Sequence, residues 1–466
     1  MNKVFVFCIG GTGIRVMKSI TMLMAGGMST NGYVVVPIIV DPHLDLEEKK
    51  NLHSLIESYQ NIYERSVSNG NSTLNPLDGF FNSKIETLPD IKTKQTDTKP
   101  ASGLNEKFRN YINVARLGTD NINNLLVETM FSSKNLDSPL SVGFKGNPNV
   151  GTVVLSNMME HGVDWFSGFM NQCADGDRVF IISSIFGGTG ASGYPLLEKK
   201  IREADSHPAV RDAIMGAVTV LPYYGLKDPQ TSGSDIDSAN FYTKTKAALA
   251  YYEKTVRANY LYYVGEKSMR QIYENDEHRQ DDKAHFVELV AASALFDFLS
   301  RPKPERQQFM TRAIEDDKDS MSLMTLGRGY RQIIKCVADY MLLRKLVMML
   351  PDEKYFPLKI NRGFDDGFYG DNAYKELRSF TDWYFQWYSE LASNNRAFAP
   401  LNYDKIKQMD GWIKDITLDA ANDTYYLLEM VRASNAHKKR EHNNKFRFFL
   451  QFAHEAIDHY TQKIYN

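Results

Sequence analysis

The spacing of apolar residues predicts alternating strands and helices near the start of the chain. Lys3–Ile9 has the composition of a strand, and Ile14–Leu23 carries apolar residues at helical spacing. Tyr33–Val40 is an almost wholly apolar run, as expected of a parallel strand that is buried on both faces. Pro37 counts against that assignment, because proline cannot donate a hydrogen bond to a neighbouring strand.

The same alternation returns after residue 143. The expected strands are Arg178–Ile185, Ile214–Leu221 and Tyr260–Val264, and the expected helices are Val153–Cys173, Tyr194–Ala204, Asn240–Thr255 and Ala284–Leu299. Strands that alternate with helices through short connections are typical of a parallel sheet covered by helices. We therefore expect an α/β domain over residues 1–300. Within it, residues 42–142 are less regular and are expected to form a surface insertion, with a helix over Asn105–Phe131.

From about residue 328 the pattern changes to amphipathic, aromatic-rich segments, and strand-like runs disappear. The expected helices are Tyr330–Leu350, Tyr374–Ala392, Tyr403–Ser434 and Lys445–Tyr465. The sequence thus predicts a second, mainly α-helical domain over residues 301–466. Its tryptophans lie at helical spacing, which favours packing in a core.

Charge and composition exclude several classes of protein. The 466 residues include 55 Lys and Arg against 57 Asp and Glu, so the chain is not a globally basic nucleic-acid binder. A hydrophobic content of 43% is enough for a large core. Cys8, Cys173 and Cys336 are too few and too far apart for a disulfide framework or a cysteine-based zinc site. No apolar run reaches the ~20 residues of a membrane span. We expect a cytoplasmic protein with no membrane span and no nucleic-acid partner, although 437–442 is a local basic cluster.

Two glycine loops of the same form follow predicted strands and precede predicted helices. They are Gly10–Gly13 and Gly187–Gly190, both with the sequence GGTG. Glycine lets the backbone approach a ligand closely, and the N–H groups at a helix start attract anions. One such loop is also compatible with a simple tight turn. Val16 replaces the third glycine of a dinucleotide fingerprint, and no Walker-A lysine follows either loop.

Two such loops in one parallel sheet both open at its carboxyl edge, where ligands of α/β sheets bind. The pair therefore predicts one polyphosphate site, in which Thr12 and Thr189 would donate hydroxyl hydrogen bonds to the same oxygens.

The order of three motifs resembles the tubulin/FtsZ superfamily, and within it the divergent bacterial tubulin-like proteins. The motifs are GGTG after the first strand, the GFKGNPNVG string at residues 143–151 and the FGGTGASG string at residues 186–193. In that family such loops surround a guanine nucleotide. The positions that match by motif are Gly10, Gly11, Thr12, Gly13, Gly146, Asn147, Gly187, Gly188, Thr189 and Gly190. Asp41 matches the start of a further nucleotide loop, and Asn240 a ribose-contacting position.

The chain departs from the family pattern at several places. Phe186 replaces the first glycine of the signature, and Ser192 its last. The family reads guanine with two asparagines, whereas this chain has Gly265-Glu266 and Ala284 at those places. Glu266 could accept from the N1/N2 edge of guanine, so the resemblance implies GTP or GDP with Mg²⁺ but leaves the base open.

In the family, acidic residues after the central helix hydrolyse the nucleotide of a neighbouring subunit. The matching region, 301–327, contains several acidic residues but no such motif, and a solvated acidic loop is the alternative interpretation. Asp316 and Asp319 are the candidate catalytic residues, and the resemblance implies hydrolysis that is slow or depends on assembly. Such carboxylates position water and metal.

The resemblance implies a nucleotide-binding protein that stacks head to tail into filaments. An alternative is a nucleotide-sensing interaction protein whose helical domain docks a protein partner, for example in a bacterial defence or cell-organisation system. A doubly wound enzyme for a phosphorylated metabolite is a third possibility, but no nucleophile–base pair supports it. His285 is expected to have a structural role, and Asp235 and Asp237 to be turn residues.

Overall fold

The computed structural model describes most of the chain, and every structural statement below concerns that part. The described residues are 1–42, 47–69, 72–88, 106–118, 121–144, 146–160, 164–226, 241–266, 271–273, 283–314, 326–327, 329–351, 364–394, 398 and 444–465.

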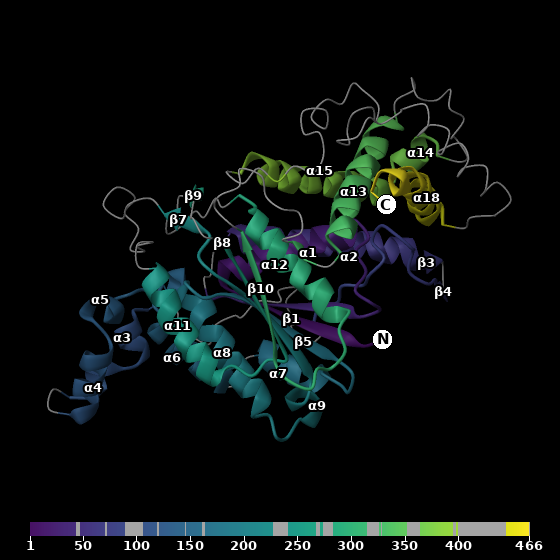
Figure 1. Ribbon diagram of the computed structural model, residues 1–466. Helices are drawn as coiled ribbons and strands as arrows, with labels where there is room; N and C mark the ends of the chain where they lie inside the picture. Colours follow the sequence, from purple (N-terminus) through teal and green to yellow (C-terminus); the bar gives the residue numbers. More distant parts are fainter. Residues whose placement is uncertain are drawn as a thin grey trace.

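A six-stranded parallel sheet forms the centre of the molecule (Figure 1). Its order is β10-β8-β6-β5-β1-β2, and every neighbouring pair runs parallel. The strands are β1 (Lys3–Ile9), β2 (Val34–Val40), β5 (Arg178–Ser184), β6 (Ile214–Val220), β8 (Tyr260–Glu266) and β10 (Gln308–Ile314). Two small sheets pair β3 (Ser68–Asn69) with β4 (Ser72–Thr73) and β7 (Tyr224–Leu226) with β9 (Gln271–Tyr273).

Helices cover both faces of the sheet, as the sequence pattern predicts. Alternate side chains of β1, β2, β5, β6 and β8 enter one of two apolar clusters, because successive residues of a strand point to opposite faces. One cluster is closed by α1 (Gly10–Ala25) and α12 (Phe286–Leu299). The other is closed by α6 (Pro148–Glu160), α7 (Asp164–Gln172), α8 (Gly188–Arg202) and α11 (Phe241–Thr255). The short α9 spans Pro208–Arg211.

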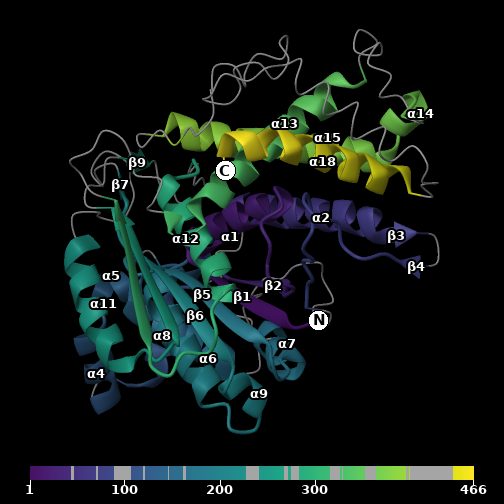
Figure 2. The ribbon, with the colours of Figure 1, turned by 45° about the vertical axis from the view of Figure 1, so that its right-hand side comes forward.

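The C-terminal helices form a further layer on α1 and α2. Figure 2 shows α13 (Tyr330–Met349), α15 (Asn372–Ser393) and α18 (Lys445–Tyr465) lying across α1 and α2, on the side away from the sheet. The short α14 spans Asp366–Tyr369. The cluster that begins on the sheet continues into this layer, with Trp387 and Phe449 fully buried. The two predicted regions therefore share one core.

Residues 42–142 are more regular and more buried than their sequence indicated. The first part is α2 (Glu47–Val67), whose stripe of Leu52, Leu55 and Tyr59 is buried in the shared core. The single helix expected over Asn105–Phe131 was wrong. The chain there is divided into α3 (Phe108–Tyr111), the 3-10 turn Val114–Arg116 and α4 (Ile122–Met130), followed by α5 (Ser133–Leu136) and a 3-10 turn at Leu140–Val142. Asn113, with φ of 58°, interrupts helical geometry.

Two further expectations needed correction. The helix expected over Val153–Cys173 is two helices, α6 and α7. The sheet continues past residue 300, because β10 pairs with β8 along its whole length. β10 lies at the sheet edge and leaves Phe309 64% exposed, so it lacks the continuous apolar run by which the central strands are recognised.

Pro37 lies within β2, opposite Val6 of β1. β2 is the last strand at its end of the sheet and has only a bridge from Val35 to Ile85 on its outer side. A missing N–H is tolerated at such an edge. The three cysteines are free and buried.

Candidate functional site

The two GGTG loops form the first turns of α1 and α8. The helices begin at Gly10 and Gly188, a few residues earlier than apolar spacing predicted. Their N-cap residues, Ile9 and Gly187, have extended backbones and no side-chain oxygen to accept from the first-turn N–H groups. Each helix start therefore presents backbone donors and the positive end of a helix dipole at the carboxyl edge of the sheet.

These two helix starts lie against each other. A Cβ built on Gly10 would be 3.5 Å from the Cβ of Thr189 and 3.7 Å from the backbone nitrogen of Gly190. Gly10 has φ of +72°, a conformation that favours glycine. The motifs, nearly 180 residues apart in sequence, thus converge at adjacent strands β1 and β5.

The Asn-Pro loop joins them from the start of α6. A Cβ on Gly188 would lie 3.1 Å from the backbone nitrogens of both Gly146 and Asn147. Lys244 of α11 reaches the same loop, where its Nζ donates to the carbonyl of Gly146 at 2.9 Å. Three helix N-termini are therefore gathered at one edge. Among the residues of the two GGTG loops and the Gly146-Asn147 pair, those that are partly exposed are Gly11, Asn147, Gly187 and Thr189.

Several of the glycines serve backbone packing. A Cβ on Gly13 would lie 2.6 Å from the carbonyl carbon of Cys8, and one on Gly188 would lie 2.9 Å from the Cβ of Phe144. Such distances are shorter than normal contacts, so these positions need glycine whatever ligand the loops hold. Their glycines bring the helix starts close to the strands and to the Asn-Pro loop.

Thr12 belongs to a buried network that the sequence did not predict. Its Oγ1 accepts from Arg15 Nη2 at 3.5 Å, and Arg15 Nε donates to Glu288 Oε1 at 2.7 Å. The hydroxyl of Tyr223 donates to the same Glu288 oxygen at 2.6 Å. The Thr12 side chain is 5% exposed and is held by α12, so its predicted role as a phosphate donor stays a prediction.

Glu266 and His285 face each other between the end of β8 and the start of α12. Glu266 Oε2 lies 3.6 Å from His285 Nε2, and both side chains are buried. His285 is the N-cap of α12: its Nδ1 accepts from Val287 N at 3.1 Å, and Glu288 accepts from the His285 N–H. The expected structural role of His285 is confirmed. Glu266 lies against this cap, and its contact with a base stays a prediction.

Phe186, the departure from the family signature, fills an aromatic cluster. Its ring centroid lies 4.9 Å from that of Phe241, 5.5 Å from Tyr224 and 6.1 Å from Tyr223. The other departure, Ser192, donates to the carbonyl of Gly188 at 2.7 Å. Both substitutions support the loop from outside its GGTG centre.

The remaining predicted residues are placed only in part. Asp41 ends the edge strand β2 and is 5% exposed, and its backbone carbonyl accepts from Lys49 Nζ at 3.5 Å. Asn240, Asp316 and Asp319 lie outside the described residues, as do Asp235, Asp237 and the basic cluster at 437–442.

Neither a metal centre nor a membrane span is found in the described ranges. No group of three or more His, Cys, Asp or Glu side chains there could hold a metal ion. None of the helices in those ranges is both long and apolar enough to cross a bilayer.

Comparison with known proteins gives a weak likeness among solved structures. No family model and no curated protein matches the chain. Among solved structures, CetZ from Methanosaeta thermophila strain DSM 6194 is 14% identical and has a TM-score of 0.27. The match covers 57% of this chain and 46% of that one, so the chain spans less than half of its length. The α/β class is established by the sheet itself.

Proposed function

We propose that the chain binds a nucleoside di- or triphosphate at the carboxyl edge of its sheet. The observation that carries this proposal is the close approach of Gly10 to Thr189 and Gly190, where a Cβ added to Gly10 would be in van der Waals contact with the start of α8. Two helix dipoles and two sets of first-turn N–H groups then favour one multiply charged anion. A single phosphate would need only one helix start, so their pairing supports a polyphosphate.

The surroundings fit this ligand. Gly11, Thr189 and Asn147 are partly exposed at the shared edge, and the ammonium of Lys244 lies beside the Asn-Pro loop. Mg²⁺ usually takes most of its ligands from phosphate and water, so it needs no dedicated protein cluster. The motif resemblance favours GTP or GDP, with Glu266 as the candidate for reading the base.

The direct test is to identify any nucleotide that copurifies with the full chain. Acid extraction followed by chromatography and mass spectrometry should reveal a nucleoside di- or triphosphate. Fluorescent GTP, ATP and CTP analogues should then be titrated separately. Equal affinity for all three would remove the guanine preference, and no binding of any would overturn the proposal.

Assembly and hydrolysis are the finer parts of the proposal. We propose that nucleotide lies between subunits stacked head to tail, an arrangement that gives open filaments, with Asp316 and Asp319 acting on the neighbour's nucleotide. Nucleotide-dependent light scattering and electron microscopy test assembly. Wild-type turnover in an Asp316→Ala, Asp319→Ala double variant would refute the catalytic assignment.

One contact favours the alternative, a nucleotide-sensing protein whose helical layer docks a partner. Glu390 of α15 accepts from Lys18 of α1 at 3.2 Å and from the backbone N–H of Ala284 at 3.1 Å. The C-terminal layer is thereby attached to α1, which begins in the first glycine loop, and to the segment that precedes α12. A nucleotide-bound monomer or dimer, without polymers, would favour this alternative.

A further inference from the structure

A cleft of about 370 Å³ lies where α1, α2, α15 and the start of α12 meet. Its α1 residues directly follow the first glycine loop, and none of the residues proposed to bind phosphate lines it. Its volume falls in the range of pockets that hold ligands.

The walls of this cleft carry an excess of negative charge. Its charged side chains are four carboxylates and two cations, namely Glu47, Glu48, Glu288, Glu390, Arg15 and Lys18. Both cations are already paired with carboxylates of the same cleft. Arg15 bonds Glu288 at 2.7 Å and Glu48 at 3.3 Å, and Lys18 bonds Glu390 at 3.2 Å. A guest therefore meets a surplus of two negative charges, which a cationic group would complement.

A partly exposed tryptophan in the cleft indicates which kind of cationic group it would bind. Trp383 of α15 lines the cleft and is 36% exposed, unusually open for an indole. A planar guanidinium stacks on an indole face and also pairs with carboxylates. Gln386, one turn further on, donates to Glu390 at 3.1 Å and leaves its carbonyl oxygen to accept. The wall thus suits an arginine side chain.

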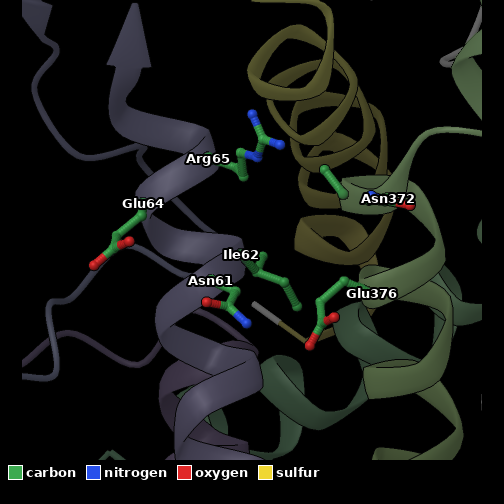
Figure 3. A pocket seen from close by; sticks show the side chains of 7 residues that line it. Asn61, Ile62, Glu64, Arg65, Asn372 and Glu376 are labelled. Carbon is green, nitrogen blue, oxygen red and sulfur yellow. The ribbon is translucent and has the colours of Figure 1, made fainter.

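A second hollow lies further along the seam between α2 and α15. Glu47–Leu55 faces Trp383–Glu390 in the cleft, and Asn61–Arg65 faces Asn372–Glu376 in the second hollow of about 260 Å³, so the helices run antiparallel. Figure 3 shows Glu376 directed across this second hollow toward Asn61 and Ile62. The ten residues from Leu52 to Ile62 correspond to about 15 Å of helix. About five residues of extended chain span that distance.

We propose that the α2–α15 seam docks an extended segment of a protein partner, with one arginine entering the cleft beside Trp383. The amides of Asn61 and Asn372 and the carboxylate of Glu376 would receive polar groups about five residues further along the segment. Two hollows on one seam fit a polypeptide better than a single small cation.

The test uses the full chain and a fluorescein-labelled peptide with one arginine and, after four Gly/Ser residues, one glutamine, because Arg65 lines the second hollow beside Glu64 and Glu376. Anisotropy at physiological salt should show saturable binding, and the same peptide with glutamate in place of arginine should not bind. A Glu47→Gln, Trp383→Ala double variant should weaken binding about fivefold or more, because it removes one charge and the stacking face.

A Glu203→Gln, Phe309→Ala double variant is the matched control. It makes the same kinds of change at exposed residues away from the seam. The side chain of Glu203 is 60% exposed, and Phe309 is 64% exposed. The affinity of this control variant for the peptide should equal that of the wild type, and thermal unfolding should confirm that both double variants fold.

Four results would overturn the proposal. They are absence of peptide binding, unchanged binding by the Trp383 double variant, competition by spermine at equal charge concentration, and a dimer of the chain that is lost in Trp383→Ala. The last two would assign the seam to a polyamine or to a second copy. None of these measurements depends on nucleotide, so failure here leaves the phosphate site untouched.

Discussion

Arg15 of α1 and Glu288 of α12 form an ion pair of 2.7 Å across 273 residues of sequence. Their side chains are only 6% and 1% exposed. Arg15 also bonds Thr12 in the first glycine loop, and Glu288 also caps α12 through His285. One buried pair therefore ties the proposed phosphate loop to the helix that follows β8.

Breaking this pair should destabilise the protein strongly. Arg15→Met leaves the Glu288 carboxylate buried without its cation, which typically costs about 3–5 kcal/mol of unfolding free energy. Urea unfolding followed by circular dichroism measures the loss. The Arg15→Met, Glu288→Gln double variant should recover part of it, because the fully buried carboxylate of Glu288 is then neutral, although Glu48 still loses its contact with Arg15.

An exposed pair supplies the control. Arg211 and Asp212 lie 3.0 Å apart but at 38% and 61% side-chain exposure, so Arg211→Met should leave stability nearly unchanged. A similar small effect for Arg15→Met would show that the buried pair does not hold α1 to α12.

Substituting Gly188 tests whether nucleotide affinity depends on the packing of the second glycine loop against the Asn-Pro loop. A Cβ at Gly188 would lie 2.9 Å from the Cβ of Phe144 and must displace the Asn-Pro loop. We expect Gly188→Ala to weaken binding of a fluorescent GTP analogue tenfold or more, since a lost charge-assisted hydrogen bond is worth about 1.5–3 kcal/mol.

Gly32→Ala is the matched variant. Gly32 has φ of +80° and no atom within 4 Å of an added Cβ, so alanine there brings strain of about 1 kcal/mol but no steric conflict. Its affinity for the nucleotide analogue should be that of the wild type. Equal losses in both variants would mean that general destabilisation, rather than the loop contact, weakens binding.

Phe186 should matter for stability. Truncation to alanine removes ring contacts with Phe241, Tyr224 and Tyr223, and comparable core truncations cost about 3–5 kcal/mol. Thermal unfolding of Phe186→Ala, beside Phe309→Ala at the exposed sheet edge, measures the difference. The second variant should change stability by no more than about 0.5 kcal/mol. Equal transition temperatures for the two variants would contradict the packing role of Phe186.

Glu198 of α8 should make stability depend on pH. Burial raises the pKa of Glu198 from 4.5 to about 7. Two contacts oppose this rise: the backbone N–H of Arg257 donates to Glu198 Oε1 at 2.6 Å, and the positive charge of Arg202 lies nearby. Because the folded-state pKa is the higher one, the folded state binds the proton more tightly. The stability that protonation of Glu198 contributes is complete below pH 4.5 and is lost as the pH rises to about 7.

Glu198→Gln, which stays neutral, should remove this dependence. At pH 8 the free energy of unfolding of the variant should exceed that of the wild type by about 3 kcal/mol, and this difference should vanish near pH 4.5. Urea unfolding at several pH values measures it. Glu203→Gln, with its 60% exposed side chain, should follow the wild type, and parallel pH profiles for wild type and Glu198→Gln would contradict the prediction.

The central elements could be predicted from sequence because their burial is repetitive. β1, β5 and β6 lie inside a sheet covered on both faces, so nearly every residue is buried and each strand has a continuous apolar run that is visible in the sequence. The GGTG loops were also visible, since glycine is needed where Gly10 adopts positive φ and where Gly13 approaches the Cys8 backbone. That the two loops would meet at one edge followed only from assuming a parallel sheet.

Tertiary structure alone decided the rest, because its causes lie far apart in sequence. Nothing near Arg15 indicates that Glu288 will neutralise it, and nothing near His285 indicates that Glu266 will face it. The edge strand β10 has a half-polar pattern because one side stays uncovered, and α2 is a core helix only because α1 and α15 pack against it. Local patterns report the burial of a segment, but they do not report which distant charge or surface provides it.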